Sequence, residues 1–66
     1  MEYFFKEVTN LKTNKTRYYI NGKRVNIGDF CLTSITCELH GFKYNSARTY
    51  EQDGKRYNVF YWNKTL

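Results

Sequence analysis

The sequence predicts an α+β fold, in which one short helix packs on one face of an antiparallel sheet of four or five strands. Two turn signals, Asn21-Gly22 and Asp53-Gly54, each stand between strand-like segments and favour tight β-hairpins, because both turn positions need a positive φ. Between the hairpins, residues 29–40 place apolar side chains at helical spacing. A chain of 66 residues has room for one domain, which we expect to span residues 1–66.

The first strand is predicted at residues 3–9, YFFKEVT, with aromatic side chains on both faces. The polar stretch that follows, NLKTNKT, predicts a turn near Thr13-Asn14. Nothing in this segment fixes how the first strand pairs with the rest of the sheet, so its register stays open.

The first hairpin is predicted around RYYINGKRV, residues 17–25. A two-residue turn predicts these pairs: Ile20 with Lys23, Tyr19 with Arg24, Tyr18 with Val25, Arg17 with Asn26, and Thr16 with Ile27. Because side chains alternate between faces, the core face would hold Tyr18, Ile20, Val25 and Ile27. The outer face would hold Arg17, Tyr19, Arg24 and Asn26. On that face Tyr19 and Arg24 are directly opposite and could stack.

The helix is predicted over residues 29–40, DFCLTSITCELH, by periodicity rather than propensity. At about 100° per residue, one arc collects Cys31, Leu32, Ile35 and Leu39. Asp29 suits the N-cap and Gly41 the position after the last turn. Phe42 would then make the apolar contact that accompanies such an ending.

The second hairpin is predicted in residues 42–62, with Asp53-Gly54 as its turn. The expected pairs are Glu51 with Arg56, Tyr50 with Tyr57, Arg48 with Val59, and Ala47 with Phe60. Alternation would place Ala47, Phe60 and Trp62 on one face, and Arg48, Tyr50, Tyr57, Val59 and Tyr61 on the other. We expect Phe60 and Trp62 inside, because the tyrosines of the other face can turn their hydroxyls to water. The predicted core is therefore Phe5, Tyr18, Ile20, Val25, Ile27, Cys31, Leu32, Ile35, Leu39, Phe60 and Trp62.

The net charge of +5, from eleven Lys and Arg against six acids, favours nucleic acid, an anionic membrane surface or an acidic protein as partner. A basic surface that merely keeps the protein in solution remains the alternative. No stretch approaches membrane-spanning length, and MEYFFKEV is unlike a signal peptide. With two cysteines only, we expect an intracellular protein with reduced thiols and no membrane contact.

Catalysis is not expected, because the single histidine, His40, has no base–nucleophile set around it. Cys37 and His40 are three residues apart and could form half of a zinc site, although a structural zinc needs four ligands. Cys31 lies on another face of the helix. We therefore predict a protein that is not an enzyme and has no cofactor.

Binding by cations and rings is the chemistry that remains, since cations track phosphates and rings stack on bases. The two hairpins supply the candidates for a partner-binding surface. They are Arg17, Tyr19, Lys23, Arg24, Arg48, Lys55, Arg56 and Tyr57. No named nucleic-acid motif accompanies them.

The run TRYYINGKRVN, followed by a short helix and then LHGFKYNS, resembles a group of very small accessory proteins of phages and prophages of low-GC Gram-positive bacteria. The resemblance covers roughly residues 15–46. It implies a binding protein in the cytoplasm of a bacterial host, anti-CRISPR-like in size and type, that blocks a host nuclease stoichiometrically. Many such inhibitors are acidic DNA mimics, and this basic chain departs from them.

Three functions follow as expectations. The first is a phage-encoded inhibitor of a host nucleic-acid enzyme, foremost a CRISPR effector nuclease. The second is a DNA- or RNA-binding accessory protein that uses a basic and aromatic sheet face. The third is a small structural or assembly protein. A homodimer would be a way to bury a leftover apolar face.

Overall fold

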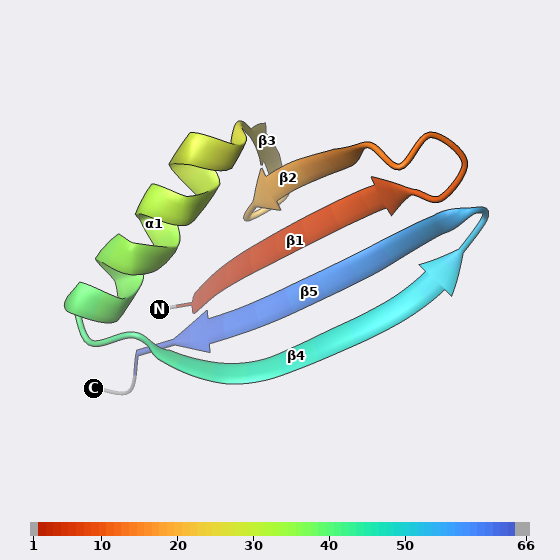
Figure 1. Ribbon diagram of the computed structural model, residues 1–66. Coiled ribbons are helices and arrows are strands. Elements are labelled where there is room, and N and C mark those ends of the chain that lie inside the picture. The colour runs from red at the N-terminus through yellow and green to blue at the C-terminus, as the bar shows by residue number, and fades with distance from the viewer. Residues whose placement is uncertain (1, 65–66) are drawn as a thin grey trace.

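One five-stranded antiparallel sheet and one helix make up the computed structural model, which describes residues 2–64 except for the side chains of residues 44 and 45 (Figure 1). The elements, in chain order, are β1 (Glu2–Asn10), β2 (Thr16–Ile20), β3 (Lys23–Val25), α1 (Ile27–Leu39), β4 (Lys43–Gln52) and β5 (Lys55–Asn63). The strand order in the sheet is β3-β2-β1-β5-β4. The predicted α+β class is confirmed, and the N-terminal strand is the central one.

Both hairpin turns form as predicted. Asn21 and Gly22 have φ values of 51° and 79°, and Asp53 and Gly54 have values of 52° and 75°. The pairs predicted nearest each turn are all present, from Ile20–Lys23 to Tyr18–Val25 and from Glu51–Arg56 to Ala47–Phe60. Two-residue turns with positive φ match the twist of the flanking strands, which is why they determine the register.

The first hairpin is shorter than predicted, because β3 ends at Val25. The predicted pairs of Arg17 with Asn26 and of Thr16 with Ile27 are therefore wrong. Asn26 is instead the N-cap of α1, and its Oδ1 accepts a hydrogen bond from the Asp29 backbone N–H at 2.8 Å. The predicted N-cap, Asp29, is instead the third residue of the helix. There its carboxylate interacts favourably with the positive N-terminal end of the helix dipole.

The helix ends at Leu39, one residue before the predicted end, and His40 is the C-cap; Gly41 follows it with the role that the sequence predicted. Gly41 has a φ of 85°, a conformation that costs glycine little. Its N–H donates to the Glu38 carbonyl at 3.1 Å, and the Phe42 N–H donates to the Cys37 carbonyl at 2.9 Å. Phe42 is buried against the core, as this helix ending favours.

The core lies between α1 and one end of the sheet, the end where β1 begins and β5 finishes (Figure 1). Four side chains are buried there, namely Phe5, Phe30, Cys37 and Phe42. Six more pack against them while half-buried, namely Tyr3, Tyr18, Ile20, Val25, Phe60 and Trp62. Five of the predicted core residues are in neither group, namely Ile27, Cys31, Leu32, Ile35 and Leu39.

The helix turns the opposite face to the sheet from the one predicted. Phe30 and Cys37 point inward, while Leu32 and Leu39 are 63% and 79% exposed. The Phe30 ring packs edge-on against Phe5 at 5.3 Å between centroids and lies 5.0 Å from the Tyr18 ring. A large ring buries more area than one aliphatic side chain and gains from edge-to-face geometry. Ring packing therefore sets the rotation of the helix.

Removing the Phe5 ring should unfold the protein. Phe5 is 1% exposed at the centre of β1, and Phe→Ala in a core costs about 3–5 kcal/mol. A domain of this size is stabilised by only about 3–5 kcal/mol in total. We expect Phe5→Ala to lose the cooperative unfolding transition in urea, followed by circular dichroism. Phe4→Ala, whose ring is 41% exposed on the opposite face, should keep the transition with a loss of about 1 kcal/mol.

The rotation of α1 can be checked through its two thiols. Burial raises the pKa of Cys37, which is 3% exposed, so this thiol has both less thiolate and less access to reagents. In a Cys31→Ser variant, we expect Ellman's reagent at pH 8 to modify Cys37 at least about tenfold more slowly than in the urea-unfolded chain. An equally rapid reaction of the folded variant would mean that Cys37 faces solvent.

Candidate nucleic-acid interface

The sheet face opposite α1, here called the open face, gathers cations and rings from all five strands. The strand registers align one residue from each of the five strands in a row across the sheet. From the β3 edge to the β4 edge, this row is Arg24, Tyr19, Lys6, Val59 and Arg48. Side chains of one row share a face because each stands directly opposite its neighbour. The row therefore places a cation on β3, on β1 and on β4.

A second row runs beside the first. It consists of Arg17 on β2, Val8 on β1, Tyr57 on β5 and Tyr50 on β4. The Tyr50 and Tyr57 rings stack with 4.9 Å between centroids and 6° between planes. The Arg48 guanidinium lies 5.2 Å from the Tyr50 ring centroid, so the two rows touch at the β4 edge. Cations and rings are therefore interspersed on this surface, with Val8 and Val59 between them on the two central strands.

Lys6 lies at the centre of the open face. Its ammonium is 4.9 Å from the centroid of the Tyr19 ring, within the range of a cation–π contact. The sequence predicted that Arg24 could stack on Tyr19, but the cation that the structure records over this ring comes from β1. Arg24 is the direct pairing partner of Tyr19 and is exposed at the sheet edge.

An open hollow of about 320 Å³ lies on this face near the turn that joins β1 to β2. Three cationic residues, Lys15, Arg17 and Lys55, line it, and no acidic residue does. The remaining lining residues are Val8, Asn10, Thr13 and Tyr19. A recess with three positive charges and a tyrosine suits an anionic oxygen group such as a phosphate.

The loop beside this hollow is held by Asn10. Its Oδ1 accepts hydrogen bonds from the backbone N–H groups of Lys12 and Thr13, at 2.9 and 3.2 Å. Its carbonyl accepts from the N–H of Asn14, whose φ of 61° makes the turn that the sequence predicted. This asparagine therefore fixes the position of the chain that carries Lys15.

Acidic residues are almost absent from the open face. Within residues 2–64, Glu2 is the one strand acid whose register position lies there, at the far end from the hollow. The others lie elsewhere: Glu7 and Glu51 on the helix side of the sheet, Asp29 and Glu38 on α1, and Asp53 in a turn. The positive charge is thus concentrated on one face.

Tyr61 and Phe4 form the apolar end of the open face. Their ring centroids are 4.0 Å apart, with 72° between the planes. The Tyr61 hydroxyl donates to the Glu2 carboxylate at 3.3 Å. Partial burial, the negative charge of Glu2 and this hydrogen bond all raise the pKa of Tyr61 above its ordinary value.

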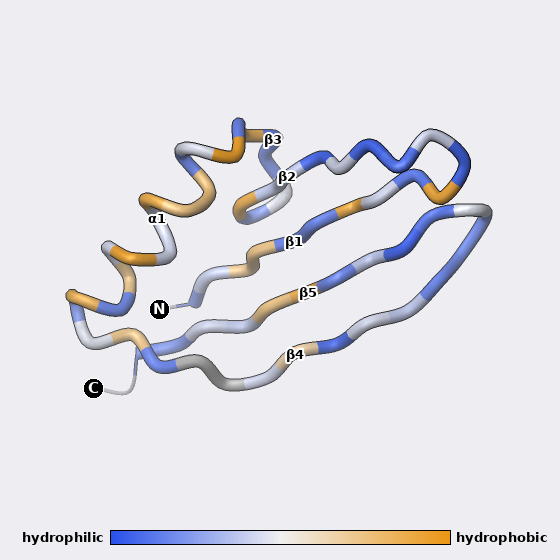
Figure 2. The backbone as a smooth tube through the Cα atoms, viewed as in Figure 1, coloured by the Kyte–Doolittle hydropathy of each residue, from blue (hydrophilic) through white to orange (hydrophobic). Residues whose placement is uncertain are grey.

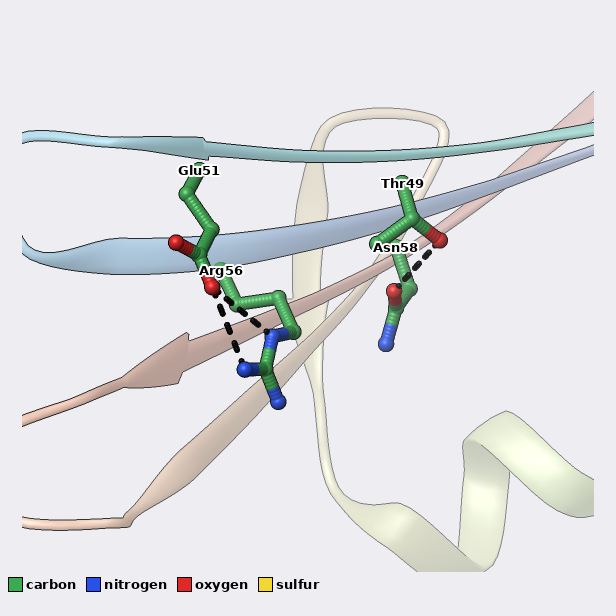
Figure 3. Close-up of polar contacts among 4 residues, drawn as sticks. All are labelled: Thr49, Glu51, Arg56 and Asn58. Atoms are coloured by element: carbon green, nitrogen blue, oxygen red, sulfur yellow. Dashed lines mark hydrogen bonds and ion pairs between the residues drawn. The ribbon is translucent and has the colours of Figure 1, made fainter.

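The structure brings six of the eight predicted partner-binding residues together on the open face. They are Arg17, Tyr19, Arg24, Arg48, Lys55 and Tyr57. Lys23 and Arg56 point to the other side. Arg56 donates there to the Glu51 carboxylate at 3.1 Å, beside a hydrogen bond from Thr49 to Asn58 at 2.9 Å (Figure 3).

Sequence reasoning missed Lys6 and Lys15, the two cations next to Tyr19 and in the hollow. The position of Lys6 on this face could not be predicted, because the register of the first strand depends on pairing with β5, some 50 residues away. Tyr50, which stacks on Tyr57, was placed on the correct face but not counted as a binding residue. The alternation within each hairpin was the signal that could have included it.

No other chemistry is visible in the described part of the chain. Within it, no three His, Cys, Asp or Glu side chains lie close enough together to hold a metal ion. Cys37 is buried in the core, and His40 is exposed at the end of α1. The helix of residues 27–39 is not long and apolar enough to cross a membrane.

No family model, no curated protein and no solved structure matches this chain. What the protein does must therefore be argued from the chemistry of the open face.

The Glu2–Tyr61 contact can be tested by titration. Glu2→Gln removes the negative charge and keeps an acceptor, so the pKa of Tyr61 should fall toward its ordinary value while the part due to burial remains. Ring ¹³C NMR shifts of labelled tyrosine, followed from pH 8 to about 12, measure this. Glu51→Gln, on the helix side, should leave the Tyr61 titration unchanged. An unchanged titration in Glu2→Gln would contradict the contact.

Proposed function

We propose that the protein binds single-stranded nucleic acid across its open face. The observation that carries this proposal is the interleaving of cations and rings on one face, with the acids placed almost entirely elsewhere. Cations neutralise backbone phosphates, and aromatic side chains stack on bases. A duplex hides the faces of its bases, so a surface with half-buried tyrosine rings and the exposed Phe4 ring favours a single strand.

Each part of the open face has a role in this proposal. The hollow of Lys15, Arg17 and Lys55 holds a phosphate, and Tyr19 at its border supplies a ring for an adjacent base. Phe4, 41% exposed, offers a second ring at the other end of the face. The cations of the first row, on β3, β1 and β4, track the backbone across the strands.

The binding test is fluorescence anisotropy with labelled single- and double-stranded DNA and RNA. We expect the single strand to bind more tightly than the duplex. With about four phosphates contacted, affinity should fall by about 50-fold between 50 and 200 mM salt, because bound counterions are released. Submicromolar binding that survives near physiological salt supports the proposal. Absent binding, or binding that vanishes with salt, overturns it.

The binding face is tested by two matched double variants. Arg17→Glu with Arg24→Glu reverses two charges on the open face, and we expect affinity to fall by at least about 100-fold. Lys23→Glu with Arg56→Glu makes the same change in net charge on the other side of the sheet. This control should lose only a few fold, through the long-range field. Equal losses in both would show that net charge, not this face, drives binding.

The second candidate is the one that the sequence resemblance implies, a phage-encoded inhibitor of a host nucleic-acid enzyme, foremost a CRISPR effector nuclease. What favours it here is the same positive face, which would also fit an acidic protein surface. It predicts poor binding of bare nucleic acid together with stoichiometric loss of target cleavage by a purified effector nuclease. The Arg17→Glu with Arg24→Glu variant should then lose the inhibition, and the control variant should keep it.

A further inference from the structure

The helix surface that faces away from the sheet is unusually apolar. Four aliphatic side chains on it are 55–79% exposed, namely Ile27, Leu32, Ile35 and Leu39, and Cys31 is exposed among them. We call these five residues the outer helix face. They fall within an arc of about 140° around α1, in which Glu38 is the one charged residue. Figure 2 shows apolar residues recurring along every turn of the helix.

The inner side of α1 is the more polar one. Thr33 and Ser34 are half-buried there, next to Phe30 and Cys37. A surface helix normally turns its aliphatic stripe toward the core and its hydroxyl residues toward water. Here the stripe is left uncovered, although a chain of this size needs most of its apolar area in the core to be stable. An uncovered stripe of this kind marks a surface for association.

The spacing of the stripe fits a second helix of the same kind. Gly28, Leu32, Ile35 and Leu39 follow one another at intervals of four, three and four residues, which is the seam of a paired helix. A two-fold axis between residues 33 and 34 would place Leu39 of one copy over Gly28 of the other. It would also place Leu32 against Ile35. Leu39, the most exposed of the four aliphatic side chains, thereby meets Gly28, which has no side chain.

Charge opposes self-association less at this face than over the cationic rest of the molecule. The net charge of +5 makes two copies repel each other. However, none of the eleven Lys and Arg residues lies in α1, whose charged residues are Asp29 and Glu38. An antiparallel pair also brings the positive end of each helix dipole next to the negative end of the other. The cationic open faces would point outward.

The area suits a weak dimer. The exposed fractions of the four aliphatic side chains correspond to on the order of 400 Å² of apolar surface per copy, the size of patch that marks an interaction site. With the flanking atoms of Cys31, Thr36 and Glu38, two copies would bury about 1,000 Å² in total. That is the lower limit for a specific interface, the size class of weak and transient contacts, and we expect a dissociation constant in the micromolar range.

We propose that the protein forms a two-fold homodimer through the outer helix face, with the two copies of α1 antiparallel. This proposal is independent of nucleic-acid binding, because it uses the opposite side of the molecule. The test is sedimentation velocity from about 1 to 500 μM, which spans the expected dissociation constant. The wild type should pass from monomer to dimer within this range. A wild type that stays monomeric throughout overturns the proposal and leaves the face to a different partner.

Two variants and one control locate the interface. Ile35→Glu and, separately, Leu39→Glu each place a charge on the stripe and should remain monomeric to the highest concentration. Leu39 is 79% exposed, so this variant should fold even if Ile35→Glu does not, as circular dichroism will show. Leu11→Glu, at a 41% exposed leucine in the β1–β2 turn, is the control and should dimerise like the wild type. Dimers in both stripe variants overturn the proposal.

The reactivity of the Cys31 thiol gives a second measurement of the monomer–dimer equilibrium. This thiol is exposed in the monomer and lies within the outer helix face, whereas Cys37 is already buried. The fast-reacting thiol of the wild type should react several-fold more slowly with Ellman's reagent above the dimer midpoint than below it. In Leu39→Glu the rate constant should not depend on protein concentration. A concentration-independent rate constant in the wild type contradicts the proposed interface.

Discussion

The packing of the Phe5 ring against α1 is the interaction on which the rest of the structure depends. Phe5 is 1% exposed on the central strand, and its ring lies 5.3 Å from Phe30 and 6.2 Å from Trp62. Among the described side chains four are buried, and Phe5 is the one that is fully buried, so this ring carries a large share of the core. It also decides the two surfaces. Because the Phe5 ring packs against Phe30, the aliphatic stripe of α1 faces outward. The helix that Phe5 holds covers one face of the sheet, and the opposite face stays open.

Local turn chemistry allowed much of the sheet to be predicted from the sequence. The Asn-Gly and Asp-Gly turns gave both hairpins with their inner pairs, and alternation then placed Tyr57 and Arg48 on one face. Two things were beyond local reasoning. Asn26 could extend strand β3 or cap the helix, and in the structure its side chain caps the helix. The rotation of α1 depended on rings from β1 and β2, whereas periodicity counts every apolar residue alike.

The candidate site was predictable to the same extent. Residues on the two hairpins were brought to one face by pairing rules that act over a few residues. Lys6 belongs to β1, which joins the hairpins only through tertiary contacts, and no local pattern gives that register. If α1 pairs as proposed, the dimer carries two open faces on opposite sides. One flexible strand bound to both would then gain affinity by effective concentration rather than by new contacts.

The position of β1 in the middle of the sheet also has a consequence for biosynthesis. One edge of β1 can form its hydrogen bonds only after β5 has been synthesised. Glu2 and Tyr61, which are in contact, are 59 residues apart in the sequence. On a translating ribosome, the β2–β3 hairpin can form within microseconds of leaving the exit tunnel. The aromatic strand YFF keeps one bare edge until residues 55–63 emerge. During that interval the nascent chain presents an apolar, unpaired strand of the kind that holdase chaperones recognise.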